Sequence, residues 1–173
     1  MGPSPFVTYV SHSEKKTLEI ARKLSRTLKP GMVVAVAGPI GSGKTVFMKG
    51  LSRGLGVKDS KEVKSPTFVL LHLYEGKFPI QHFDLYRLED RASLDDLGFD
   101  EFLSNAEAVT VVEWADKALG RIPKDAVWVT FKVTGPTSRS IVIARPGPKQ
   151  GRSNPRLPRL LRHPQKQLTD SSQ

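Results

Sequence analysis

The strongest indication of fold in this chain is the stretch Gly38-Pro39-Ile40-Gly41-Ser42-Gly43-Lys44-Thr45. It matches G-x-x-x-x-G-K-[ST], the pattern of a phosphate-binding loop (P-loop), and stands between an apolar strand-like segment at 32–37 and a helix-compatible stretch at 46–53. Glycines allow such a backbone to direct its N–H groups at phosphate oxygens, and the following helix adds the positive end of its dipole. Lys44 would then reach the β- and γ-phosphates, and the Thr45 hydroxyl would bind Mg²⁺. We therefore expect a bound nucleotide with Mg²⁺.

The 173-residue chain is long enough for one domain with a single core. Its first residues lack the basic and apolar regions of a signal peptide, and no apolar run approaches the length of a membrane span. The absence of cysteine excludes disulfides, Cys-ligated zinc and thiol nucleophiles. Together these features favour a cytoplasmic protein with no membrane contact.

The formal net charge of +10 suggests a nucleic-acid partner, but the charge is unevenly distributed. Residues 147–173 hold six Lys/Arg and one Asp, which gives +5 and leaves +5 for residues 1–146. This basic, Pro-rich tail has little to bury, so we expect it to be disordered and residues 1–146 to form the P-loop domain. The alternative for the tail is an RNA-binding or partner-binding arm.

The predicted elements alternate between strands and helices. Helices are expected at 46–53 and behind Ser11-His12-Ser13-Glu14, which resembles a capping box with Ser11 as N-cap and Glu14 at N3. Strands are expected at 6–10, 32–37, 68–74, 78–86, 108–112, 126–133 and 140–144. This order predicts an α/β fold in which helices flank a mixed central sheet, parallel near the P-loop and antiparallel in its hairpins.

A P-loop that works with Mg²⁺ needs another acidic group, usually at the carboxyl end of a neighbouring strand. Asp84 and Glu113 are the two candidates. Glu113 has the better apolar lead-in, because two polar residues interrupt the run before Asp84. Both remain candidates for the metal or water shell. His82 is interpreted as a structural strand residue, and Trp114 as a core residue, with a base-stacking platform as the alternative.

Ser65-Pro66-Thr67 lies between the predicted P-loop helix and the next strand, where nucleotide hydrolases carry switch segments. The Thr67 hydroxyl is placed to sense Mg²⁺ or the γ-phosphate in that interpretation. A proline-fixed turn with a local hydroxyl hydrogen bond is equally compatible with these residues.

Other functional classes fit the sequence less well. A small-molecule kinase is the main alternative, but kinases usually carry an arginine-rich lid, whereas residues 89–101 hold six acids and one base. A GTPase is disfavoured because the base-reading motif N-K-x-D does not occur. A noncatalytic RNA-binding protein would depend on the tail, so that deleting the tail would abolish function and Lys44→Ala would not.

Four segments occur together in this sequence: Gly38 to Thr45, Ser65-Pro-Thr-Phe68, His82-Phe-Asp-Leu-Tyr-Arg-Leu88 and Val111-Val-Glu-Trp114. In this order and spacing they resemble the bacterial TsaE family, the ATPase subunit of tRNA threonylcarbamoyladenosine (t⁶A) biosynthesis. The loop alone is common to many enzymes, but its combination with the other three segments is far more specific. The resemblance extends from about residue 6 to residue 144, and the basic tail lies beyond the family's usual end.

The resemblance implies a P-loop NTPase fold and slow ATP hydrolysis that is needed for t⁶A formation at position 37 of tRNAs reading ANN codons. ATP and Mg²⁺ are the cofactors it implies. It also implies docking to TsaB and TsaD, of which TsaD transfers the threonylcarbamoyl group, so that tRNA is met through the complex. No arginine finger is evident in the sequence, and we therefore expect low turnover by the isolated protein.

The resemblance also assigns roles to residues. It implies catalytic roles for Lys44, Asp84 and Thr67, and metal binding by Thr45 and Glu113. It places Ser13 and Glu14, near the start of the first helix, beside the nucleotide base. The expected nucleotide-binding residues are Gly38, Pro39, Ile40, Gly41, Ser42, Gly43, Lys44, Thr45, Ser13 and Glu14.

Overall fold

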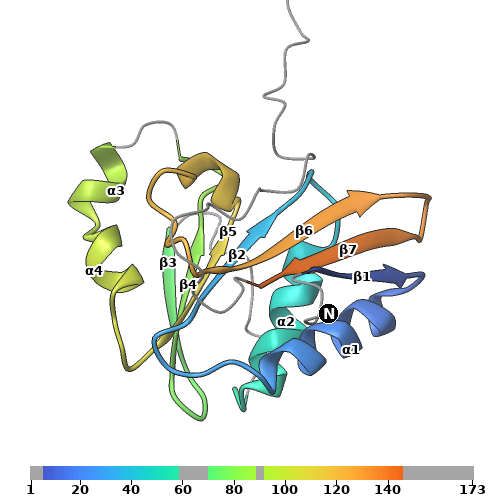
Figure 1. Cartoon of the computed structure of the whole chain (residues 1–173), viewed down its shortest axis with the longest axis horizontal. Coiled ribbons are helices and arrows are strands. Elements are labelled where there is room, and N and C mark those ends of the chain that lie inside the picture. Colours follow the sequence, from blue (N-terminus) through green and yellow to red (C-terminus); the bar gives the residue numbers. More distant parts are fainter. Residues whose placement is uncertain (1–5, 59–69, 89–91, 146–173) are drawn as a thin grey trace, which may run out of the picture.

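The computed structural model describes residues 6–58, 70–88 and 92–145, and these form one seven-stranded sheet with helices on both faces (Figure 1). The α/β fold with a mixed sheet is confirmed. The strands are β1 (Phe6–Ser11), β2 (Val33–Ala37), β3 (Leu71–Glu75), β4 (Pro79–Asp84), β5 (Val109–Glu113), β6 (Val127–Val133) and β7 (Arg139–Ala144). The helices are α1 (Glu14–Ser25), α2 (Lys44–Gly54), α3 (Ala92–Asp96), α4 (Phe99–Leu103) and the 3₁₀ turn η1 (Ala115–Ala118).

The strand order is β1-β7-β6-β2-β5-β4-β3, and its centre is parallel. β2 lies between β5 and β6 and runs parallel to both, and β4 runs parallel to β5. The three hairpin or edge pairs, β1–β7, β6–β7 and β3–β4, are antiparallel. Every residue of β2 and β5 is buried, as expected for strands covered on both faces. The carboxyl ends of β2, β4 and β5 therefore meet at one edge of the sheet.

Two hydrophobic clusters hold the helices to the sheet. One joins α1 and α2 to one face, with Phe47 and Leu51 of α2 fully buried. The other joins α3, α4 and η1 to the opposite face through residues such as Phe83 and Phe99, whose ring centroids lie 4.9 Å apart. The division into a domain at 1–146 and a tail at 147–173 stays a prediction, since the tail lies outside the described residues. No described helix is long and apolar enough to cross a membrane.

The start of α1 differs from the prediction. The N-cap is Ser13, whose hydroxyl accepts a hydrogen bond from Lys16 N at 3.2 Å, and the helix begins at Glu14. Ser11 is instead the last residue of β1, paired with Arg139, and its hydroxyl lies 2.8 Å from Thr17 Oγ1. The prediction of Ser11 as N-cap was wrong because strand pairing with β7 continues through Ser11.

Candidate functional site

The P-loop connects β2 to α2, and two of its glycines are required by geometry. A Cβ atom on Gly38 would lie 2.7 Å from Phe131 Cβ on β6, so no side chain fits there. Gly43 is the N-cap of α2 with φ of +101°, a left-handed conformation that favours glycine. α2 begins at Lys44, two residues earlier than predicted, so Lys44 and Thr45 occupy its first turn. The amide groups of that turn lack intrahelical partners and suit an anion.

Lys44 is buried beneath an aromatic ring. Its side chain is 5% exposed, and Nζ donates hydrogen bonds to the carbonyl oxygens of Gly38 and Pro39, each at 2.8 Å. Nζ also lies 3.8 Å from the centroid of the Trp114 ring. Burial lowers the pKa of the Lys44 amine, while the carboxylates of Glu113, Asp116 and Asp84 act in the opposite direction. Trp114 is partly buried against the core and also covers the Lys44 ammonium group, a cation–π contact that the sequence did not predict; its role as a base-stacking platform stays a prediction.

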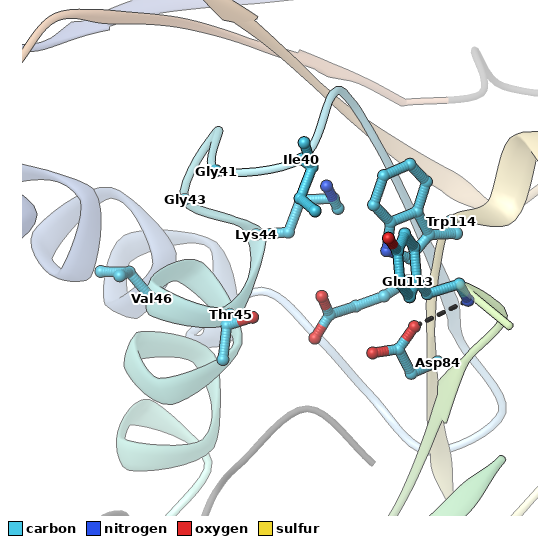
Figure 2. A pocket seen from close by; sticks show the side chains of 10 residues that line it. Ile40, Gly41, Gly43, Lys44, Thr45, Val46, Asp84, Glu113 and Trp114 are labelled. Carbon is cyan, nitrogen blue, oxygen red and sulfur yellow. Dashed lines mark hydrogen bonds between the residues drawn. The ribbon is translucent and has the colours of Figure 1, made fainter. Parts of the chain in front are cut away.

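Asp84 and Glu113 end adjacent parallel strands and are direct register partners. Asp84 Oδ1 accepts a hydrogen bond from Tyr86 N at 2.9 Å. Burial raises the pKa of the Asp84 carboxyl, and the negative charge of Glu113 raises it further. Figure 2 shows both carboxylates directed toward Thr45 at the start of α2. The sequence-based choice between the two acids is therefore unnecessary, because the structure brings both to one place.

His82 is a buried residue of β4, as the sequence interpretation expected, but its partner was not predicted. Its Nε2 lies 2.8 Å from Glu113 Oε1 across the β4–β5 pair, and both side chains are almost completely buried. Since a carboxylate only accepts, Nε2 carries the proton in this contact. His82 Nδ1 has no hydrogen-bond partner among the described residues. The signal available in the sequence was the spacing of two residues between His82 and Asp84, which places both on one face of a strand.

Lys44, Asp84, Glu113 and Trp114 line a cavity of about 350 Å³ at the carboxyl edge of the sheet (Figure 2). Its lining residues are Ile40, Gly41, Gly43, Lys44, Thr45, Val46, Asp84, Tyr86, Glu113 and Trp114. The predicted residues Gly38 and Pro39 contribute through their carbonyl contacts with Lys44 rather than by lining this cavity.

The donor set in this cavity fits Mg²⁺. Thr45 offers a hydroxyl oxygen, and Asp84 and Glu113 offer carboxylate oxygens. Mg²⁺ prefers oxygen ligands, keeps several waters and binds through one or two protein carboxylates. The pKa of Asp84 is raised mainly by burial and further by the negative charge of Glu113, and a bound cation would offset both costs of keeping the acid ionised. No cluster of three or more acidic, His or Cys ligands occurs in the described segments, so water and phosphate oxygens would complete the shell.

Ser13 and Glu14 line a second cavity, of about 220 Å³, on the other side of the P-loop. Its other lining residues are Thr17, Ser42, Gly43, Val46, Pro136, Thr137 and Arg139. Gly43 and Val46 border both cavities, so the two spaces adjoin at the start of α2. Arg139, which reaches the loop from β7, was not anticipated from the sequence because nothing local to it marks a loop contact. Thr67 lies outside the described residues, as does the tail at 147–173.

The P-loop between a buried strand and helix, the parallel strands beside it and the acids at their carboxyl ends define a P-loop NTPase. Comparison with known proteins narrows this class. The family model described as "Threonylcarbamoyl adenosine biosynthesis protein TsaE" matches residues 11–141. The chain belongs to the TsaE family, as the resemblance predicted, and this family takes part in t⁶A biosynthesis.

Curated relatives carry the same family name. The tRNA threonylcarbamoyladenosine biosynthesis protein TsaE of Treponema pallidum is 35% identical over 135 residues, which cover 78% of this chain and 98% of the relative. The protein of that name from Bacillus subtilis is 36% identical over 134 residues, covering 77% and 82%. Among solved structures, Bacillus subtilis YdiB superposes with a TM-score of 0.67 at 28% identity, covering 82% of this chain and 86% of YdiB.

Proposed function

We propose that the protein is a Mg²⁺-dependent ATPase that serves t⁶A formation at position 37 of tRNAs reading ANN codons. The observation that carries this proposal is the convergence of Lys44, Thr45, Asp84 and Glu113 on one cavity beside the P-loop. Phosphoryl transfer to water requires positioning and charge neutralisation rather than covalent chemistry, and these groups supply both.

Each residue has a distinct part in this proposal. Lys44 would exchange its two carbonyl contacts for the β- and γ-phosphates, and the start of α2 would hold the phosphates through its free amides. Thr45 and Glu113 would hold Mg²⁺, which supplies positive charge to the phosphate oxygens. Asp84 would orient or deprotonate the attacking water, since its raised pKa suits a base better than that of an exposed aspartate. Thr67 keeps its proposed role as a sensor of the γ-phosphate.

The second cavity is where we propose that the nucleoside binds. It adjoins the P-loop at Gly43 and Val46 and is bordered by Ser13 and Glu14. A nucleotide whose phosphates occupy the larger cavity would extend its sugar and base around the start of α2 into the smaller one. This arrangement supports the expectation that Ser13 and Glu14 lie beside the base.

The proposal includes protein partners. None of the described residues that line the larger cavity is an arginine, so the charge that develops during hydrolysis lacks the cation that raises turnover in fast NTPases. We therefore propose that hydrolysis is slow in the isolated protein and that a TsaB–TsaD complex completes the site, with tRNA met through that complex. A kinase is less well supported, because α3 and α4 are short and carry acids of the segment 89–101 instead of an arginine-rich lid.

Co-purification tests this function. Wild type should join the TsaB–TsaD pair in a nucleotide-dependent manner, and Lys44→Ala and Glu113→Ala should each abolish t⁶A formation in the reconstituted reaction. The absence of any complex under all nucleotide conditions would overturn the partner assignment. Fast steady-state ATP hydrolysis by the isolated protein would contradict its dependence on partners.

A further inference from the structure

The guanidinium group of Arg139, at the start of β7, contacts two turns of the backbone. Toward the P-loop, Nε donates to Ser42 O at 3.2 Å and Nη2 donates to Gly41 O at 3.3 Å. Toward the β6–β7 turn, Nη1 lies within 3.1 to 3.3 Å of three carbonyl oxygens, those of Gly135, Pro136 and Ser138. One side chain therefore joins the second half of the loop to the turn beside it.

The P-loop carbonyls are divided between two cations. Lys44 holds the carbonyls of Gly38 and Pro39 in the first half, whereas Arg139 holds those of Gly41 and Ser42 in the second half. A loop that binds phosphate must keep its N–H groups toward the anion and its carbonyl dipoles away from it. Lys44 has to break its hydrogen bonds to the carbonyls of Gly38 and Pro39 in order to reach a phosphate. Arg139 can keep its hydrogen bonds to Gly41 and Ser42 while phosphate is bound, because it lines the second cavity and not the one that would hold the phosphates.

The β6–β7 turn that Arg139 contacts is itself bonded to the segment between β1 and α1. Ser138 Oγ lies 2.9 Å from His12 Nδ1 in the segment between β1 and α1, and Ser11 at the end of β1 pairs with Arg139. Pro136 and Thr137 of the turn and Ser13 and Glu14 of the α1 start face the same second cavity. Arg139 thus connects the P-loop to the β6–β7 turn, which lines the second cavity and is held in position by its contacts with β1 and the segment before α1.

We propose that Arg139 is a positioning residue that holds the second half of the P-loop in its phosphate-binding conformation and sets the spacing between the two cavities. This inference rests on the proposed function, in that the ligand is a nucleotide. Arginine suits the role because its planar group stays charged and offers five N–H donors in a fixed geometry. Lysine cannot reproduce the contacts to both turns, since its single ammonium offers three donors at one point.

The test measures ADP binding by calorimetry for wild type, Arg139→Gln, Arg139→Lys and the control Arg145→Gln, each with Mg²⁺ and with EDTA. Arg145 follows the same strand at its end far from the P-loop, and its guanidinium donates a hydrogen bond to Thr27 Oγ1 at 2.8 Å. Arg139→Gln should weaken ADP binding by roughly tenfold or more, as expected for the loss of charge-assisted hydrogen bonds. Arg139→Lys should be intermediate, and Arg145→Gln should match wild type.

The loss for Arg139→Gln should be the same with Mg²⁺ and with EDTA, because Arg139 contacts neither Thr45 nor Glu113. Far-UV circular dichroism and thermal melting give the folded fraction of each variant. The inference is overturned if Arg139→Gln binds ADP as Arg145→Gln does, or if its loss disappears once the folded fraction is taken into account. Failure of wild type to bind ADP at all would instead overturn the proposed function on which the inference rests.

Discussion

His82 Nε2 and Glu113 Oε1 lie 2.8 Å apart in the interior of the sheet, with side chains that are 0% and 2% exposed. The hydrogen bond joins the strand that ends in Asp84 to the strand that ends in Glu113. It occupies one oxygen of Glu113 and leaves the other for the cavity that contains Thr45 and Lys44. The candidate metal ligand is thus held in place by a neighbour that takes no part in lining the cavity.

Replacing His82 by Phe should destabilise the protein, because it leaves a buried carboxylate without its donor. A loss of about 2 kcal/mol in the free energy of unfolding is expected from the unpaired group. Urea denaturation of His82→Phe, of Glu113→Gln and of the double variant measures the free energy of unfolding of each. The double variant should lose less than the sum of the single losses, and strict additivity would show that the two side chains are not coupled. His72→Phe on the adjacent strand is the matched control, since the His72 ring Nδ1 lies 3.2 Å from Tyr74 Oη and makes its hydrogen bond there.

Glu113→Gln should remove the benefit that Mg²⁺ gives to nucleotide binding. The amide keeps the size of the carboxylate and can still accept from His82, but it loses the charge that attracts the cation. Titration of ADP with and without Mg²⁺ separates the affinity for the nucleotide itself from the gain in affinity that Mg²⁺ provides. Affinity in EDTA should stay near that of wild type, whereas the gain on adding Mg²⁺ should fall by about tenfold. An undiminished gain would exclude Glu113 as a metal ligand.

Asp84→Asn should stabilise the protein measured without nucleotide while it abolishes hydrolysis. The raised pKa of Asp84 means that folding disfavours its ionised form, so removing the charge at neutral pH should add about 1 kcal/mol. Below the ordinary pKa of aspartate the carboxyl is protonated in both states and the penalty vanishes. The advantage of Asp84→Asn should therefore be full at neutral pH and shrink as the pH falls through the raised pKa. Denaturation at several pH values tests this, and a lower stability of Asp84→Asn at neutral pH would contradict it.

Trp114 fluorescence should report nucleotide binding. Lys44 Nζ lies 3.8 Å from the centroid of this ring, and it must move if it is to exchange loop carbonyls for phosphates. A Trp128→Phe background leaves Trp114 as the single tryptophan. ADP should shift its emission intensity in that background, and Lys44→Met should abolish the response. A response that persists in Lys44→Met would show that the ring senses another change.

Local sequence predicted the parts of the site that depend on neighbouring residues. The P-loop pattern located Lys44 and Thr45, and the rule that ligands gather at carboxyl ends of parallel strands located Asp84 and Glu113. Their pairing in register could not be read from the chain, because β4 and β5 are separated by α3 and α4. Ser13 and Glu14 were predicted from the family resemblance alone, and they line the second cavity instead of the one that contains Lys44 and the two acids.

Contacts between distant segments escaped prediction. Arg139 meets Gly41 and Ser42 across about a hundred residues of sequence, as their separations of 98 and 97 show. The N-cap of α1 was misplaced by two residues because the capping pattern at Ser11 is real in sequence, but pairing between β1 and β7 competes with it and prevails. The switch segment with Thr67 and the basic tail remain predictions, since both lie outside the described residues.

The pairing of Phe6 with Ala144 in the β1–β7 ladder brings the two ends of the described domain together. β7 starts beside the P-loop and runs antiparallel to β6, so both ends lie at the edge of the sheet opposite the cavities. A dye or a surface linkage attached near Phe6 or Ala144 would therefore stand clear of the two cavities. The same proximity makes the domain suited to circular permutation, in which a short linker joins Phe6 to Ala144 and new termini open elsewhere.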